Sequence, residues 1–540
     1  SLKPVYLHRM KAFRTHHIVI GLILLSFAVR IPFTHEYRLE GTGRDSSGYL
    51  KLAENFSNGE GWVNYSVQFL YSLPESLPHP DSYWSPLFPF LIAIVFSVFG
   101  VSFPVAQIVP MTFGVLLPSV VFLLAWELTR SRVAALIAGI LAVFHPTLVL
   151  WSSRVQPEIV SVFFVTLTLY FLMRKETRLK PVWVGVSLGL AYLVKYQNGA
   201  VVIAIIVYYL IHEFRSRGWK QLLLTGVVCV IAISPWLTRN TLVFGNPFFT
   251  AVQSPLISQY PEFGGTTRFV RSFDPPPEIT GYIFSHLGDS FLIMRQSIHE
   301  FILPFLSDQT GSLWLIPLGV LGLCSVPITW KRGAPLICFS VFLVLFFSVT
   351  MPMIRYVFVL IPVWIAIVAV GTLWFIDPPA RMRLLSGKPA RIVLAAVLVL
   401  AVAGEVRGTL QTVYDRDLKW APDANYGMLE AGAVSEFIHE HTDETEPVLV
   451  AQSYHYALAL DRYSISIPVE EEGVRYLGQR YGARYVVMSL RDLRQLLPTW
   501  ETEIPDWIEL VHRIPAEEIP RPPHHPDYAH VSEMRIYRLK

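Results

Sequence analysis

The sequence predicts a multi-pass α-helical membrane protein, with about 11 transmembrane helices, interfacial helices and a C-terminal extracytoplasmic α/β domain. Hydrophobic residues make up 53% of the 540 residues and charged residues only 16%, whereas about 25% are charged in an ordinary soluble protein. The apolar residues gather in runs of about the length that a membrane span requires. This pattern excludes a soluble globular enzyme and a disordered protein. All three cysteines lie inside apolar runs, so no disulfide framework is expected.

Charge excludes one class of partner and orients the N-terminus. The net charge is only +3, from 44 Lys and Arg against 41 Asp and Glu, so no basic field indicates nucleic-acid binding. The first apolar run follows Lys3, Arg9, Lys11 and Arg14, and no small-residue cleavage site comes after it. We therefore interpret this run as a retained first span with a cytoplasmic N-terminus.

Basic loops set the number of predicted spans, because short basic loops face the cytoplasm. Such loops lie at 129–132, 174–180, 213–220, 331–332 and 378–391. Only one span can then separate the outer loop 34–85 from the first basic loop. The run 86–100 is short and carries Pro86 and Pro89, so we expect it to lie at the outer surface without crossing. Eleven spans remain, at 17–33, 104–128, 133–150, 157–173, 181–195, 197–212, 221–237, 312–329, 334–351, 356–376 and 392–405.

Two domains are predicted: a transmembrane catalytic module over 1–405 and an extracytoplasmic domain over 406–540. Within the module, 34–103 forms a first outer loop with interfacial helices, and 238–311 forms a second outer loop. The C-terminal segment alternates helix-like and β-rich stretches, which is typical of a small α/β fold. The expected helices are 430–441, 469–481 and 490–498, and the expected strands are Pro447–Ala451, Tyr463–Ile467 and Arg484–Ser489.

The first outer loop offers a candidate catalytic carboxylate. Asp45 follows a glycine-containing turn and Arg44, about a dozen residues after the first span, and Tyr49 comes four residues later. At that distance Asp45 can lie at the membrane surface, where a carboxylate can act as a general base. Asp is also favoured as the N-cap of a helix, and the local sequence leaves both interpretations open.

Two further outer segments carry acidic residues. Asp81 lies in an aromatic segment that is typical of the membrane interface, and it is a weaker alternative carboxylate. A short outer loop after His145 carries Arg154 and Glu158. Glu158 would open the next span, where a carboxylate also suits the positive end of the helix dipole. Function and a purely structural role are both open for Glu158.

Three cations lie at the outer ends of spans, against the expected charge bias: Lys195, Arg239 and Arg355. A cation near membrane depth is costly unless it is paired or functional. Each could snorkel to the outer headgroups. Three such cations together with two outer carboxylates instead indicate an anionic ligand that arrives from the bilayer, since Lys and Arg both suit phosphate.

Several of these motifs resemble the GT-C glycosyltransferases that use polyprenyl-phosphate sugars, a group that contains the protein O-mannosyltransferases and the lipid A aminoarabinose transferase. The resemblance extends over about residues 15–405. It is most specific in the stretch PWLTRN at 235–240 followed by FGNP at 244–247. The other resembling features are Asp45-x-x-x-Tyr49, the segment Tyr83–Pro89, Pro157-Glu158 and Arg355-Tyr356.

This resemblance implies an inverting glycosyltransferase with a polyprenyl-phosphate-linked sugar donor and an acceptor hydroxyl on an extracytoplasmic glycan, lipid or protein. Asp45 matches the presumed base and Glu158 the second acidic residue, so both are predicted to be catalytic. Protein O-mannosyltransferases usually carry an Asp-Glu pair in the first loop, whereas Ser46 follows Asp45 here. No cofactor and no essential metal are expected. The predicted substrate-binding residues are Arg44, Tyr49, Asp81, Arg154, Lys195, Arg239, Asn240, Arg355 and Tyr356.

Three alternative functions are open at this point. A lipid-linked oligosaccharide transferase or ligase could use the same scaffold. A membrane transporter or flippase would also have many spans, although the sequence shows neither an internal inverted repeat nor a pair of broken helices. A sensory or structural membrane protein with an outer binding domain is the third. The expected location is the plasma (inner) membrane of a prokaryote, among membrane lipids.

Overall fold

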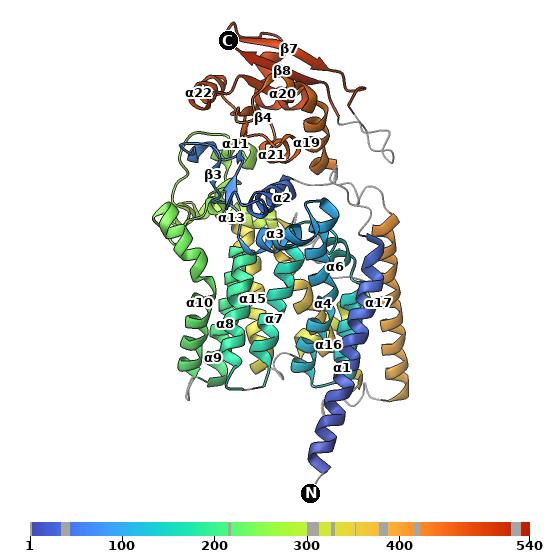
Figure 1. The fold of residues 1–540 in the computed structure, drawn as a ribbon. Coiled ribbons are helices and arrows are strands. Elements are labelled where there is room, and N and C mark those ends of the chain that lie inside the picture. The colour runs from blue at the N-terminus through green and yellow to red at the C-terminus, as the bar shows by residue number, and fades with distance from the viewer. Residues whose placement is uncertain are drawn as a thin grey trace.

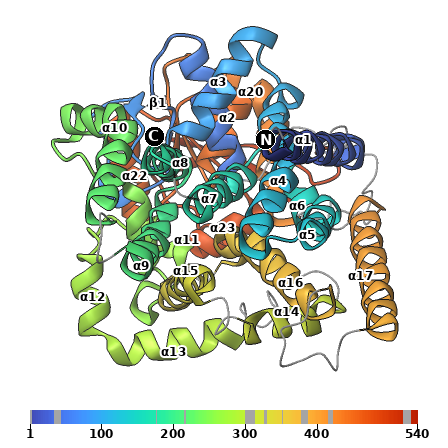
Figure 2. The same ribbon diagram turned by 90° about the horizontal axis from the view of Figure 1, so that it is seen from below.

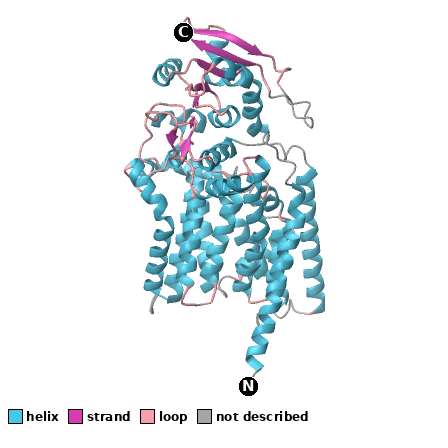
Figure 3. Ribbon diagram, in the orientation of Figure 1, coloured by secondary structure: helices cyan, strands magenta, loops and turns pink. Residues whose placement is uncertain are grey.

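A computed structural model describes residues 3–33, 44–175, 177–213, 218–299, 313–325, 330–350, 353–376, 387–414, 422–519 and 531–540. Helices fill the lower part of the molecule, and the strands lie in the upper part (Figure 3). The N-terminus lies below the helix bundle and the C-terminus at the opposite end of the molecule (Figure 1). The predicted turn at 41–43 and parts of the basic loops at 213–220 and 378–391 lie outside the described residues.

Within the described residues, each of the eleven predicted apolar runs is mostly helical, whereas 312, 326–329 and 351 lie outside those residues. Among the described residues, four segments are long and apolar enough to cross a membrane, namely α4, α10, Ile354–Ile376 and α17. The number of eleven crossings therefore stays a prediction. The helices are α1 (Lys3–Arg30), α4 (Phe103–Thr129), α5 (Arg132–Phe144) with α6 (Pro146–Trp151), α7 (Glu158–Met173), α8 (Lys180–Val194), α9 (Val202–Glu213), α10 (Gly218–Phe244), α14 (Leu315–Cys324), α15 (Trp330–Val349), α16 (Ile361–Ile376) and α17 (Lys388–Tyr414).

Short helices gather at the upper end of the bundle. Helix α3 (Leu87–Phe99) has 13 residues, about 20 Å at 1.5 Å per residue, which is shorter than the ~30 Å hydrocarbon core. It lies beside α2 (Arg44–Ser57) at the upper end of the bundle (Figure 1). Helices α12 (Ile279–Ser285) and α13 (Leu287–Ser297) run across the bundle rather than along it (Figure 2). These lengths and positions suit helices at a membrane surface.

Helices α14 and α16 approach each other closely because glycines lie at their contact. A Cβ at Gly371 would lie 1.9 Å from the backbone oxygen of Leu318, and a Cβ at Gly322 would lie 2.1 Å from the backbone oxygen of Ile367. Both distances are far inside van der Waals contact. Small residues permit such approach between membrane helices, whose association depends on packing.

Valine in place of Gly371 is therefore expected to destabilise the protein by about 1–3 kcal/mol, because the added side chain must push two backbones apart. The measurement is the thermal unfolding midpoint of the detergent-purified protein. Gly226→Val is the matched control, since Gly226 is exposed on α10 and a Cβ there meets no atom within 4 Å. Equal decreases of the unfolding midpoint in the two variants would contradict the role of Gly371 in the contact between α14 and α16.

Five strands of the C-terminal segment and β2 (Ser66–Val67) form a six-stranded mixed sheet in the order β2-β5-β4-β6-β8-β7. All three predicted strands are present, as β4 (Val448–Val450), β5 (Ser464–Ser466) and β6 (Tyr485–Ser489), and they are parallel. Hydrophobic side chains fill cores on both faces, which is why these strands read as continuous apolar runs. The remaining elements are α19 (Pro422–Ala433), α20 (Ser435–His441), α21 (Ser453–Leu460), α22 (Glu471–Tyr481), α23 (Leu490–Leu496) and the antiparallel strands β7 (Ile508–Ile514) and β8 (Met534–Leu539).

The first outer loop contributes a strand to this sheet, although its sequence does not predict one. Strand β2 (Ser66–Val67) pairs in parallel with β5 at its edge. Val67 and Leu70 join the hydrophobic core of the sheet. The sequence-based boundary at 405 therefore does not coincide with the limit of the sheet, because a two-residue strand carries too little local signal to be recognised.

The C-terminal segment contains a buried pair of carboxylates, Glu430 and Asp492, beside Arg491. Burial, together with the Asp492 carboxylate, raises the pKa of Glu430 to about 8. Since the folded state binds this proton more tightly than the unfolded state, the stabilisation is full below about pH 4 and is lost as the pH rises through about 8.

We expect Glu430→Gln to flatten the decline of the unfolding midpoint between about pH 5 and pH 8, because glutamine carries no proton to lose. Thermal unfolding across this pH range measures the effect. The control is Glu440→Gln, an exposed position on α20, which is expected to keep the wild-type slope. If the unfolding midpoint of Glu430→Gln falls with pH as steeply as that of the wild type, Glu430 is not the group responsible for this pH dependence.

Candidate active site

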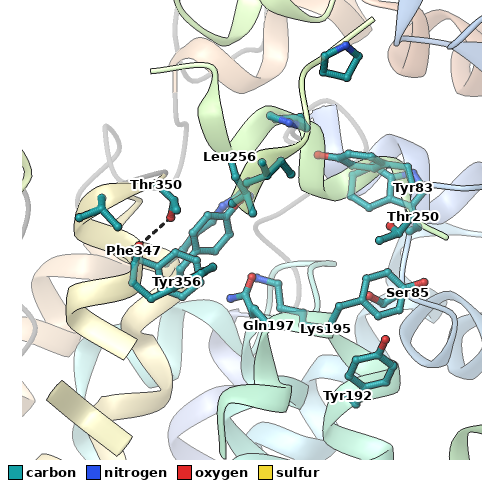
Figure 4. Close-up of a pocket in the computed structure, with 18 of the residues that line it drawn as sticks. Tyr83, Ser85, Tyr192, Lys195, Gln197, Thr250, Leu256, Phe347, Thr350 and Tyr356 are labelled. Carbon is teal, nitrogen blue, oxygen red and sulfur yellow. Dashed lines mark hydrogen bonds between the residues drawn. The ribbon is translucent and has the colours of Figure 1, made fainter. Parts of the chain in front are cut away.

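A cavity of about 770 Å³ lies at the upper end of the helix bundle. Phe347 and Tyr356 lie on one side of it and Tyr83 and Ser85 on the other, while Lys195 lies between them (Figure 4). The lining comes from segments far apart in the chain: the first outer loop, the start of α7, the end of α8, the second outer loop, the end of α15 and the turn before α16.

Four charged side chains meet in this cavity. Arg355 Nη1 lies 2.5 Å from Asp45 Oδ2, and Lys195 Nζ lies 2.9 Å from Glu158 Oε1. The two pairs are adjacent, because Arg355 Nε is 3.9 Å from the same Glu158 oxygen. The structure thus brings together both predicted catalytic carboxylates and two of the three predicted cations.

Each of the four charges lies at or beside a helix end. Asp45 is in the first turn of α2, and Glu158 is the first residue of α7, where a carboxylate suits the positive end of the dipole. Lys195 caps the C-terminal end of α8, where a cation is favoured. Arg355 lies in the 3₁₀ turn Ile354–Leu360 that leads into α16. Asp45 is therefore inside the first turn of α2 and is not its N-cap, so the N-cap interpretation is wrong, and this start of the helix faces the cavity.

Burial distinguishes the two pairs. The side chains of Arg355 and Asp45 are 25% and 26% exposed, whereas those of Lys195 and Glu158 are 12% and 2% exposed. Of the carboxylates in these two pairs, Asp45 is thus the one that a ligand in the cavity can reach. The nearly buried Glu158 is in a position to orient the two cations.

Aromatic side chains of the first loop form one wall of the cavity. The rings of Tyr49 and Trp84 lie 4.2 Å apart, and those of Tyr83 and Trp84 lie 4.6 Å apart. Burial and the nearby Asp45 carboxylate raise the pKa of Tyr49, so its hydroxyl stays a hydrogen-bond donor. A Cβ at Gly48 would lie 2.8 Å from the Trp84 indole nitrogen, so the close approach of α2 to this ring requires glycine.

Asp81 holds the aromatic wall in place from outside the cavity. It is fully buried, accepts a hydrogen bond from the backbone N–H of Trp84 at 3.0 Å, and accepts another from the Asn64 amide at 3.1 Å. Burial raises the pKa of Asp81. It does not line the cavity, so its geometry indicates positioning of the wall rather than contact with a ligand.

The remaining predicted residues are placed differently. Tyr356 lines the cavity, and its ring lies beneath Lys195 Nζ at 5.1 Å. Arg239 packs on Trp236, and Arg154 packs on Trp151, and neither lines the cavity.

Asn240 and Arg44 are the last two predicted positions. Asn240 donates to the backbone oxygen of Phe249 and lies outside the lining. The side chain of Arg44 lies outside the described atoms.

Several lining residues were not singled out from the sequence. The second outer loop contributes residues from Thr250 to Phe284, including Glu278, which caps α12. Tyr192 and Tyr196 flank Lys195. Their only local signal is an aromatic residue near the outer end of a span, which is common at membrane interfaces.

Comparisons with known proteins agree with this architecture. The family model described as dolichyl-phosphate-mannose-protein mannosyltransferase matches residues 79–238, a range that includes Glu158 and Lys195 but not Asp45 or Arg355. No curated protein sequence matches the chain.

Three solved structures share the fold at low sequence identity. ArnT from Cupriavidus metallidurans, bound to undecaprenyl phosphate, is 12% identical with a TM-score of 0.57, and the match covers 96% of this chain and 97% of that one. The oligosaccharyltransferase AglB from Archaeoglobus fulgidus is 16% identical over 90% of this chain and 70% of that one, with a TM-score of 0.52. The arabinofuranosyltransferase AftD from Mycobacteria is 13% identical over 98% of this chain and 40% of that one, with a TM-score of 0.50.

An apolar helix bundle with a charged cavity at one end defines a polytopic membrane protein that can hold a polar ligand beside the bilayer. More particularly, the chain has the GT-C fold. The match of residues 79–238 to the mannosyltransferase family model agrees with this fold.

Proposed function

We propose that this chain is an inverting glycosyltransferase that moves a sugar from a polyprenyl phosphate to an acceptor hydroxyl at the outer face of the membrane. One observation carries the proposal: Asp45, Arg355, Lys195 and Glu158 meet in one cavity at the end of the bundle. The same cavity has an apolar side, which includes Phe346 and Phe347 and suits the start of a lipid chain.

In the proposed reaction, the acceptor oxygen forms a bond to the anomeric carbon while the bond from that carbon to the phosphate oxygen breaks. The acceptor proton passes to Asp45, which is the accessible carboxylate. The leaving phosphate gains one negative charge, which Arg355 and Lys195 stabilise. Glu158 holds the two cations in place. It is thus proposed as a positioning residue, although the sequence suggested a catalytic role for it.

The proposed orientation places the cavity and the C-terminal sheet outside and the N-terminus in the cytoplasm of a cell with a plasma (inner) membrane. The basic loop at 129–132 joins α4 to α5, and α6, at the other end of α5, lies toward the upper end of the bundle (Figure 1). The basic loop and the cavity therefore lie at opposite ends of the bundle, as the positive-inside rule requires.

A donor screen tests the proposed function. The purified protein is incubated with radiolabelled polyprenyl-phosphate mannose, glucose, arabinose or galactose and with cell-envelope acceptors, with and without a chelator. We expect transfer from one donor that is indifferent to the chelator, because the proposed step uses fixed cations. Loss of transfer with the chelator would refute metal independence, and no transfer from any donor would refute the function.

A second candidate function is transfer of a lipid-linked oligosaccharide. The fold match to the archaeal oligosaccharyltransferase AglB favours it. A pyrophosphate-linked oligosaccharide donor in the same screen separates the two candidates, since only this second function predicts its use.

A further inference from the structure

The geometry points to an exchange of partners at Arg355. We infer that Arg355 holds Asp45 while the cavity is empty, and that it moves to the phosphate oxygens of the lipid as Asp45 takes up the acceptor proton. Arg355 would thereby couple protonation of the base to stabilisation of the leaving group. This inference rests on the proposed function. It adds that Arg355 links the protonation of Asp45 to the stabilisation of the phosphate.

The first supporting observation is that Arg355 and Asp45 neutralise each other in the cavity. Arg355 Nη1 is 2.5 Å from Asp45 Oδ2, so an oxyanion that binds Arg355 through this group competes with Asp45. The Nε atom of Arg355 is buried and has no hydrogen-bond partner among the described residues. The Glu158 carboxylate lies 3.9 Å from this nitrogen, so it can hold the guanidinium in the cavity while Asp45 is exchanged for the phosphate.

The second observation explains why the exchange involves Arg355 rather than Lys195. The pair of Lys195 with Glu158 is more deeply buried, with Glu158 only 2% exposed. Breaking it would leave a carboxylate that water cannot reach, which is strongly unfavourable. The pair of Arg355 with Asp45 opens to the cavity and can separate at a lower cost. The guanidinium can also bind two oxygens of a phosphate at once, which an ammonium group cannot.

The charge balance closes with this exchange. A polyprenyl-phosphate sugar is a phosphodiester with one negative charge, and the leaving polyprenyl phosphate carries two. The four protein charges sum to zero in the empty site, since two carboxylates face two cations. When Asp45 accepts the acceptor proton it becomes neutral, so these four side chains and the phosphate together carry a charge of −1 before and after transfer. The strongest anionic neighbour of Arg355 then changes from Asp45 to the phosphate.

Binding of geranylgeranyl phosphate, a short product-like prenyl phosphate, tests the exchange without any transfer reaction. Asp45→Asn mimics the neutral base, and we expect it to bind the probe at least about fivefold more tightly than the wild type. Glu278→Gln is the matched control. It removes one negative charge from the same cavity, but Glu278 accepts hydrogen bonds from backbone N–H groups of α12, so a much smaller change is expected.

The double variant Asp45→Asn/Arg355→Met closes a thermodynamic cycle. We expect the gain from Asp45→Asn to vanish when Arg355 is absent, and we expect part of it to return with Asp45→Asn/Arg355→Lys. A gain of equal size without Arg355 would overturn the inference, as would unchanged or weaker binding by folded Asp45→Asn. Absence of any binding by the wild type would instead overturn the proposed function, so the two failures are distinguishable.

Discussion

Replacing Asp45 with asparagine is expected to lower the rate of sugar transfer by about 10²- to 10⁴-fold, which is the usual contribution of a general base. Asparagine has nearly the same shape as aspartate and can still accept a hydrogen bond from Arg355. It cannot take up the acceptor proton. The rate is therefore expected to fall while binding of the prenyl phosphate persists. Initial rates with the donor found in the screen measure the effect.

Glu54→Gln is the matched control for this variant. Glu54 lies on the same helix, and its side chain is 25% exposed, close to the 26% of Asp45. It pairs with Lys51 and does not line the cavity. Its rate is expected to stay within about twofold of the wild type, as for an ordinary partly exposed position. An unchanged transfer rate in Asp45→Asn, or an equal loss of rate in both variants, would refute the assignment of Asp45 as the base.

Methionine in place of Arg355 is expected to lower the rate by about 10²- to 10³-fold, because a fixed charge that stabilises the leaving phosphate is lost. Asp45 would also lose a neutralising partner, and Glu158 would lose a neighbouring cation. The unfolding midpoint is therefore expected to fall as well. Arg355→Lys is expected to recover only part of the rate, since lysine keeps the charge but not the two-pronged geometry. Initial rates and thermal unfolding are measured together for each variant.

Arg239→Met tests whether Arg239 binds the phosphate, as the sequence suggests, or lies outside the site, as the structure indicates. The sequence suggests that Arg239 binds phosphate as Arg355 does. The structure places Arg239 against Trp236 and outside the cavity lining, so the rate is expected to change by roughly twofold or less. If Arg239→Met lowers the transfer rate as much as Arg355→Met does, Arg239 binds phosphate as the sequence suggests. The inference that only cations lining the cavity contribute would then be wrong.

Local sequence signals were sufficient to nominate the four charges of the cavity. Each of Asp45, Glu158, Lys195 and Arg355 stands near the outer end of an apolar run, and a charge at membrane depth is costly enough to be informative by itself. The same signal also selected Arg239 and Arg154, which the structure leaves outside the lining. The signal therefore finds charges at the correct depth but does not say which way they face.

Other features of the site had no usable local signal. Asp81 appeared as a weak alternative carboxylate, yet it is buried behind the aromatic wall and accepts the N–H of Trp84. The second outer loop contributes residues from Thr250 to Phe284 without a motif. Strand β2 is only two residues long. Each of these depends on partners distant in the chain, which a window of a few residues does not contain.

The sequence by itself determined the class of molecule, the positions of the apolar helices and the strands β4 to β6, because hydropathy and its period are properties of neighbouring residues. Only the tertiary structure decided that Arg355 meets Asp45 across 310 residues of sequence, and that β2 completes the edge of a sheet formed some 400 residues later. It also decided which carboxylate a ligand can reach. These outcomes depend on how helices pack and which face each one turns inward, and packing is a property of the whole chain.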